Sequence, residues 1–212
     1  MPVIEAAMNM LALLDTFSEK QSNAVLEVLK GKVPRQNEKF PQGELHFQGS
    51  GWRGFYHCHD APGKDGQEHG HFHLFVQTSK SQGNKQTWSH LAGLSMDYEG
   101  QPIKWFTVNR WVTDGIWLPA EELKYFLDSV SPHQCHSLCE QWLLCMVSLY
   151  TDNLKQLLEE RDRQLIQINA DTTLADSLLD RDIYMLSCQP VDLEQILRSI
   201  FNETEYRKEN TL

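Results

Sequence analysis

The sequence has little positive charge and no long hydrophobic run. It carries 19 lysine and arginine residues against 29 aspartate and glutamate residues, and the basic residues form no clustered stripe. Proteins that bind nucleic acid usually present such a stripe to the phosphates, so we expect no nucleic-acid partner. No segment approaches the roughly 20 apolar residues that span a bilayer, so we expect no membrane partner.

The N-terminal segment "MPVIEAAMNMLALLDTFSEK" lacks the features of an export signal. No lysine or arginine precedes the short apolar stretch from Ala6 to Leu14, and Glu5 stands just before it. This pattern is typical of an amphipathic helix rather than a signal peptide. We therefore predict a cytoplasmic protein.

The chain has only five cysteines, an odd number that does not suggest a disulfide framework. Cys135 and Cys139 lie at i and i+4 on one predicted helix face, with His133 and His136 nearby. These residues could form a second metal site. The apolar neighbours in "HQCHSLCEQWLLCMVSLY" favour the alternative, in which the cysteines are simply buried.

The period of the apolar residues changes along the chain. Residues 3–31 and roughly 119–206 favour helix, whereas residues 44–113 favour strands separated by turn segments such as "APGKDG", "QGNK" and "DYEGQP". This order predicts the α+β class, with an N-terminal helix, a mainly antiparallel sheet and a C-terminal set of helices. The length of 212 residues and the 41% hydrophobic content suit a single domain over residues 1–212.

One predicted helix, in "DNLKQLLEERDRQLIQINADT", carries a stripe near helical spacing. The stripe consists of Leu154, Leu157, Leu158, Arg161, Leu165 and Ile168. We expect it to pack against the sheet of the same chain, and docking of a partner on it is the alternative. The chain could also form a homodimer.

Five of the nine histidines fall between positions 57 and 73. His69, His71 and His73 alternate in "EHGHFHLF", so their side chains are predicted to share one face of a strand. His57 and His59 alternate in the same way in "GWRGFYHCHD". A hairpin that joins the two strands would bring both sets together.

The register of this hairpin decides which histidines meet. If residues 60–68 form the loop, a symmetric register puts all five histidines on one face, with the pairs His59–His69, His57–His71 and Phe55–His73. Directly opposed residues have Cβ atoms about 4.5–5.5 Å apart. Their imidazole nitrogens can then converge on one ion at about 2.0–2.1 Å.

The histidine pattern predicts a site for a divalent transition metal such as zinc, iron or copper. We predict His57, His71 and His73 as ligands, because apolar neighbours anchor that part of the strand, and His59 and His69 as reserve ligands or supporting groups. Each imidazole must be neutral to bind, so affinity should weaken as the pH falls through about 6.5. A hydrogen-bonded cluster without metal is the alternative.

Glu68 and Arg110 are candidates for catalytic roles. Glu68 could be a ligand, an acceptor for an imidazole N–H, or an acid/base group. The alternation in "KWFTVNRWVTDGIW" predicts a strand with Arg110 among apolar neighbours. Its guanidinium would then pair with a carboxylate, such as Asp97 or Asp114, or receive an anionic ligand. His90 is a further ligand candidate if its strand neighbours the hairpin.

Several segments resemble known families. "HGHFHLF" resembles in part the motif of histidine-triad nucleotide hydrolases, with Gly70 at an apolar place, and residues 63–71 resemble the first half of a cupin motif. The longer segments "YHCHDAPG", "EHGHFHLF", "HLAGLSMDYEGQPIKWFTVNRWVTDGIWLPA" and "DRDIYMLS" are similar to those of a family of uncharacterised bacterial proteins, a domain of unknown function. This similarity covers most of residues 50–190 and implies no activity.

Two classes of function follow from the predicted site. In a metal-dependent enzyme, the ion would polarise a small-molecule substrate or activate water or oxygen. In a non-catalytic protein, the same histidines would sequester a metal or recognise a protein partner. Three protein ligands with a vacant position favour catalysis, whereas four or more favour storage or structure.

Overall fold

The computed structural model describes residues 2–35, 38–47, 51–58, 67–82, 85–130, 135, 137–168 and 173–209. The N-terminal half holds two helices and five strands: α1 (Val3–Glu19), α2 (Ala24–Leu29), β1 (Phe40–Phe47), β2 (Trp52–Cys58), β3 (Glu68–Gln82), β4 (Lys85–Asp97) and β5 (Pro102–Val108). The C-terminal half holds α3 (Arg110–Thr113), α4 (Ala120–Asp128), α5 (Leu138–Leu149), α6 (Thr151–Ile168), α7 (Leu174–Ser177), β6 (Met185–Pro190) and α8 (Leu193–Glu209).

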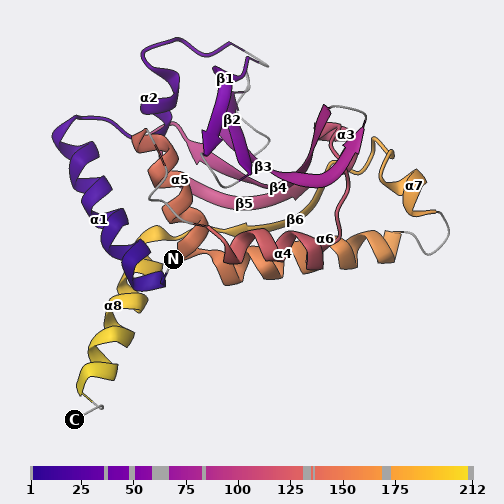
Figure 1. Cartoon of the computed structure of the whole chain (residues 1–212). Helices are drawn as coiled ribbons and strands as arrows, with labels where there is room; N and C mark the ends of the chain where they lie inside the picture. The colour runs from indigo at the N-terminus through magenta and orange to yellow at the C-terminus, as the bar shows by residue number, and fades with distance from the viewer. Residues whose placement is uncertain are drawn as a thin grey trace.

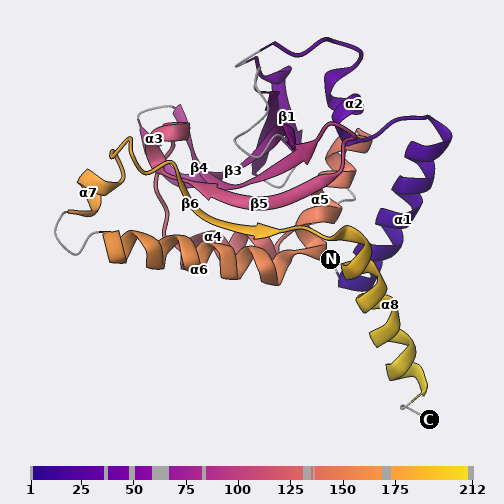
Figure 2. The same ribbon diagram turned by 180° about the vertical axis from the view of Figure 1, so that it is seen from behind.

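The strands form one antiparallel sheet in the order β1-β2-β3-β4-β5-β6, so the strands follow one another across the sheet in chain order. Figure 1 shows that the sheet curves like a trough, with α4, α5 and α6 on its outer side. The reverse view in Figure 2 shows the same arrangement. The sheet therefore has a helix-covered face and an inner face, and the two carry different side chains.

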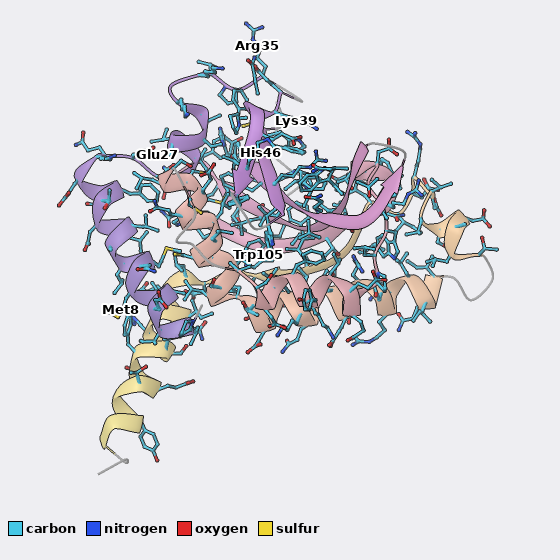
Figure 3. All side chains as sticks on the ribbon, viewed as in Figure 1. Met8, Glu27, Arg35, Lys39, His46 and Trp105 are labelled. Atoms are coloured by element: carbon cyan, nitrogen blue, oxygen red, sulfur yellow. The ribbon has the colours of Figure 1, made fainter. Side chains whose placement is uncertain are left out.

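The helix-covered face forms the main core. Phe72, Leu74 and Val76 alternate along β3, are fully buried, and pack in one cluster with side chains of α1, α2, α4, α5 and α6. Trp105 of β5 is also fully buried there, and Figure 3 shows it between the sheet and the helices. Helix α5 begins with a capping box, in which Ser137 and Glu140 each bond the other's backbone N–H at 3.2 Å. This core fixes which face of each strand stays available for a site.

The predicted α+β class is confirmed, and three boundaries differ from the predictions. The N-terminal helix is two helices, because Gln21 has φ +49° and Asn23 caps a new start by accepting the N–H of Leu26. The sheet spans Phe40–Val108 rather than 44–113 and gains β6 from the part predicted to be helical. β6 has only six residues, and their burial does not alternate regularly, so the sequence pattern does not predict a strand there. Its pairing with β5 makes it a strand.

Helix α6 uses its apolar stripe within the chain, as predicted. Leu154, Leu157, Leu158 and Leu165 are buried, and α6 packs against α4, β5 and β6. Arg161 lies in the same stripe with only 2% of its surface exposed. None of the helices in the ranges given above is both long and apolar enough to cross a bilayer.

Candidate metal centre

Three histidines meet on the inner face of the sheet, toward the loop end of the β2–β3 hairpin. Strand pairing sets His57 opposite His71 and Phe55 opposite His73, which is the predicted symmetric register. The Nε2 atoms of His57 and His71 are 2.6 Å apart, and those of His71 and His73 are 3.1 Å apart. One ligand atom from each of the three histidines lies within 4.8 Å of the others, so the predicted ligands form a group that could hold an ion.

The spacing of the nitrogens is close to that of a filled site. Two imidazole nitrogens bound to a tetrahedral zinc ion at about 2.0–2.1 Å lie about 3.3 Å from each other. The His71–His73 separation of 3.1 Å almost meets that value, and the His57–His71 separation of 2.6 Å falls short of it. His57 is the most exposed of the three, and rotation of its side chain would lengthen the separation of its Nε2 from that of His71 without moving the strands.

The centre is enclosed by protein. His71 and His73 are 3% and 2% exposed, and the edge of the Phe106 ring lies against both, at centroid distances of 5.1 and 5.9 Å. Burial, reinforced by the neighbouring histidines, lowers the pKa of His73 well below its ordinary value. A buried imidazole that stays neutral keeps its nitrogen lone pair available for a metal.

Glu68 contacts His71 and is not part of the group of three histidines that could hold an ion. Its Oε1 lies 2.6 Å from His71 Nδ1, and its Oε2 accepts a hydrogen bond from the hydroxyl of Ser95. Burial opposes the charged form of Glu68, but the hydrogen bonds from His71 and Ser95 outweigh it and lower the pKa of the carboxyl. The carboxylate thus holds the proton of His71 on Nδ1, so that the lone pair of Nε2 faces His57 and His73.

The prediction that His69 shares the face of His71 is wrong. The β3–β4 register shifts between Glu68 and Gly70, and this bulge breaks the alternation of the strand. Glu68 therefore turns to the inner face, whereas His69 Nδ1 contacts the Tyr56 hydroxyl at 2.7 Å beside the core. The other reserve ligand, His59, lies outside the described residues.

His90 reaches the centre through a second bulge. The register between β3 and β4 shifts again after Leu74, so that Phe75 pairs with His90 and the imidazole of His90 turns to the inner face. His90 Nε2 lies 3.0 Å from His73 Nδ1. Burial, with a smaller effect of Arg161, lowers the pKa of His90 to about 3, so His90 is neutral and can accept the Nδ1 proton of His73. It therefore supports His73 as Glu68 supports His71.

Sequence reasoning missed Ser95 and the supporting role of His90. Ser95 pairs with His71 across β3 and β4, and this pairing places its hydroxyl beside Glu68. The sequence offered His90 only as a further ligand candidate, on the condition that its strand neighbours the hairpin. Its position was not predictable before the strand order was known.

Arg110 does not lie on a strand, in contrast to the prediction. β5 ends at Val108, and Asn109 begins the short helix α3 by accepting the N–H of Arg110 at 2.8 Å. The side chain of Arg110 is half-buried. Within the described ranges it makes no ion pair with Asp97 or Asp114, and its buried Nε has no hydrogen-bond partner. The predicted role of Arg110 in binding an anionic ligand stays a prediction.

The cysteine cluster predicted as a second site is described only in part. Cys135 is partly buried and Cys139 is fully buried in α5, and burial raises the pKa of both thiols. A thiol held protonated is a poor metal ligand. His133 and His136, the imidazoles of that prediction, lie outside the described residues.

No curated protein and no solved structure matches the chain. One family model does match, and it covers residues 4–191, most of the chain. The matched range includes every residue of the centre, from His57 to Ser95. The chain therefore belongs to the family described as Domain of unknown function (DUF6969).

Proposed function

We propose that this chain is a metal-dependent enzyme in which His57, His71 and His73 hold one divalent transition metal through their Nε2 atoms. The observation that carries the proposal is the grouping of the three nitrogens from paired strand positions. Glu68 and His90 support it, because they contact the remaining ring nitrogens of His71 and His73. Such contacts fix the tautomer and orientation of metal-binding imidazoles in proteins.

Three neutral imidazoles leave at least one coordination position for water or substrate. Zinc, iron(II) and copper all accept such a ligand set. A bound water would become a stronger nucleophile, or a substrate carbonyl would be polarised, according to what occupies that position. Non-catalytic metal binding is the competing function, and the two differ in whether an outside ligand can enter the site.

Metal binding is tested on protein that carries no histidine tag. We expect about one ion per chain after loading with zinc, measured by elemental analysis and by calorimetric titration. His71→Ala should weaken binding by more than about 100-fold, beyond the 10–100-fold typical of supporting residues. His46→Ala is the matched control, because His46 is exposed on β1 and bonds only the backbone of Gly43 (Figure 3). Equal affinity of the wild type and His71→Ala would overturn the metal site.

The open position is tested with cobalt(II) in place of zinc. Cobalt(II) in a site with an exchangeable ligand should change its visible absorption when azide is added. We expect such a change in the wild type. A spectrum that does not respond to azide would show a closed site and would favour the non-catalytic function.

A further inference from the structure

A pocket with a volume of about 370 Å³ lies on the same face of the sheet as the metal centre. Its walls come from β2, β3 and β4 on one side and from residues 110–116 on the other, and Figures 1 and 2 show α3 beside the upturned ends of β3 and β4. The volume falls within the range of about 300–1,000 Å³ that is usual for small-molecule sites. The residues that the argument uses are Arg53, Phe75, Trp88, Arg110, Asp114 and Gly115.

Backbone contacts hold the second wall in place. The N–H of Ile116 donates to the carbonyl oxygen of Trp88 at 2.8 Å, so residues after α3 run along β4. Gly115 allows this approach, because a Cβ at that position would lie 2.8 Å from the same oxygen. Backbone contacts with β4 therefore hold the wall after α3 in place.

Two guanidinium groups line the pocket. Arg53 stacks on Trp88 at 4.4 Å and on Phe75 at 5.2 Å, and its Nη1 pairs with Glu44 at 3.2 Å. Arg110 makes no ion pair in the part of the chain that the structure describes. In both residues the Nε atom is buried without a hydrogen-bond partner. A guanidinium has five N–H donors, so the other nitrogens of Arg110 can donate to an anion in the pocket.

The pocket and the metal centre share one wall. The Phe75 ring lines the pocket, and its centroid lies 5.3 Å from that of His90 and 6.2 Å from that of His73. A molecule anchored at Arg110 and lying along Phe75 would point toward the ligands of the ion. We propose that this pocket binds the carboxylate of a planar organic monoanion, and that such a carboxylate is the substrate of the centre.

The neighbouring charges favour a monoanion over a phosphate. Asp114 lines the pocket, and Glu44 already neutralises part of the charge of Arg53. A dianionic phosphate would be attracted twice as strongly by Arg110, but it would also be repelled twice as strongly by these carboxylates, and its desolvation would cost more than twice that of a monoanion. The flat faces of Trp88 and Phe75 favour a planar body for the ligand.

The assignment of the carboxylate as substrate rests on the proposed function, but its binding can be measured without metal. Benzoate is the probe, and its binding to metal-free protein is followed by calorimetry and by tryptophan fluorescence. We expect saturable binding that Arg110→Gln weakens about tenfold or more, because a hydrogen bond to a charged group is lost. Arg198→Gln is the matched control, since Arg198 is exposed on α8. Inorganic phosphate should bind more weakly than benzoate.

The outcomes separate the pocket from the metal centre. His71→Ala should keep the affinity for benzoate and weaken that for zinc, whereas Arg110→Gln should keep the affinity for zinc and weaken that for benzoate. No benzoate binding by the wild type, unchanged affinity in Arg110→Gln, or tighter binding of phosphate would each overturn the pocket assignment. Benzoate binding at Arg110 in a protein that binds no metal would retain an anion site and remove the proposed enzyme.

Discussion

Glu68 shows how one side chain can determine the chemistry of its neighbour. An imidazole has two nitrogens, and only one of them can face an ion. Because the carboxylate of Glu68 lies 2.6 Å from His71 Nδ1, the proton of His71 is held there. Ser95 orients the same carboxylate through its second oxygen. The negative charge of Glu68 also makes Nε2 of His71 a stronger donor to a cation.

Replacement of Glu68 by glutamine tests this role. The amide oxygen of Glu68→Gln can still accept the His71 proton, but the negative charge is lost. We expect zinc affinity to fall by about 10–100-fold, measured by competition with a chelator of known affinity. Glu19→Gln, at an exposed position near the end of α1, should leave zinc affinity unchanged. A loss as large as that of His71→Ala would instead make Glu68 a direct ligand.

At the scale of elements, two bulges and one capped turn shape the inner face of the sheet. The bulges in the β3–β4 pair turn Glu68 and His90 toward the histidines. The turn after β5 depends on Asn109, which is fully buried and whose Nδ2 contacts the carbonyl oxygens of Ser177, Asp180 and Ile183 at 2.8, 3.3 and 3.2 Å. Asn109 therefore joins the start of α3 to the segment before β6.

Replacement of Asn109 should loosen this junction. Asn109→Ala removes the donor shared by the three carbonyl oxygens and the acceptor for the N–H of Arg110. We expect the free energy of unfolding to fall by about 2–3 kcal/mol in urea titrations, because buried polar groups lose their partners. Asn202→Ala, at an exposed position on α8, should change it by less than about 0.5 kcal/mol. An unchanged urea midpoint in Asn109→Ala would contradict this account.

For the molecule as a whole, the buried histidines link stability to pH. Burial lowers the pKa of His73 and His90 in the folded chain, whereas an unfolded chain binds these protons near pH 6.5. The unfolded state therefore binds more protons below pH 6.5, and the free energy of unfolding of the metal-free protein falls as the pH falls. For His90 the window extends from about 6.5 down to about 3.

The size of this effect can be measured between pH 8 and pH 5.5. One pH unit below 6.5 costs about 1.4 kcal/mol for each histidine that stays neutral in the fold. We expect His90→Gln to reduce the loss by about that amount in urea titrations of metal-free protein. Asn202→Ala should leave the pH dependence unchanged, because it removes an exposed side chain that does not titrate. Equal pH dependence in His90→Gln and the wild type would show that His90 is protonated in the folded state.

The register of the histidine hairpin was predictable from local sequence alone. Side chains alternate along any strand, and a symmetric hairpin with residues 60–68 as its loop then places His57, His71 and His73 on one face. The α+β class followed in the same way from the change of apolar period. Both properties depend on residues close together in the chain, because the two strands of a hairpin are neighbours in sequence.

Other features depend on contacts between distant segments. The fully buried arginine is Arg161 rather than Arg110: Arg161 pairs with Asp162, donates to the Leu118 carbonyl and stacks on Trp117 at 4.0 Å. A charged residue in an apolar stripe is stable only with such partners. Asp162 is the next residue of α6, but Leu118 and Trp117 come from the segment before α4, so the burial of Arg161 depends on how that segment packs on α6.

The bulges that turn Glu68 inward and His69 outward, and the pairing that brings His90 and Ser95 to the centre, also arise between strands. Alternation belongs to one strand and can be read along the chain. A register shift depends on two strands and on the core beneath them, so only the folded sheet shows which side chains contact the ring nitrogens of the histidines.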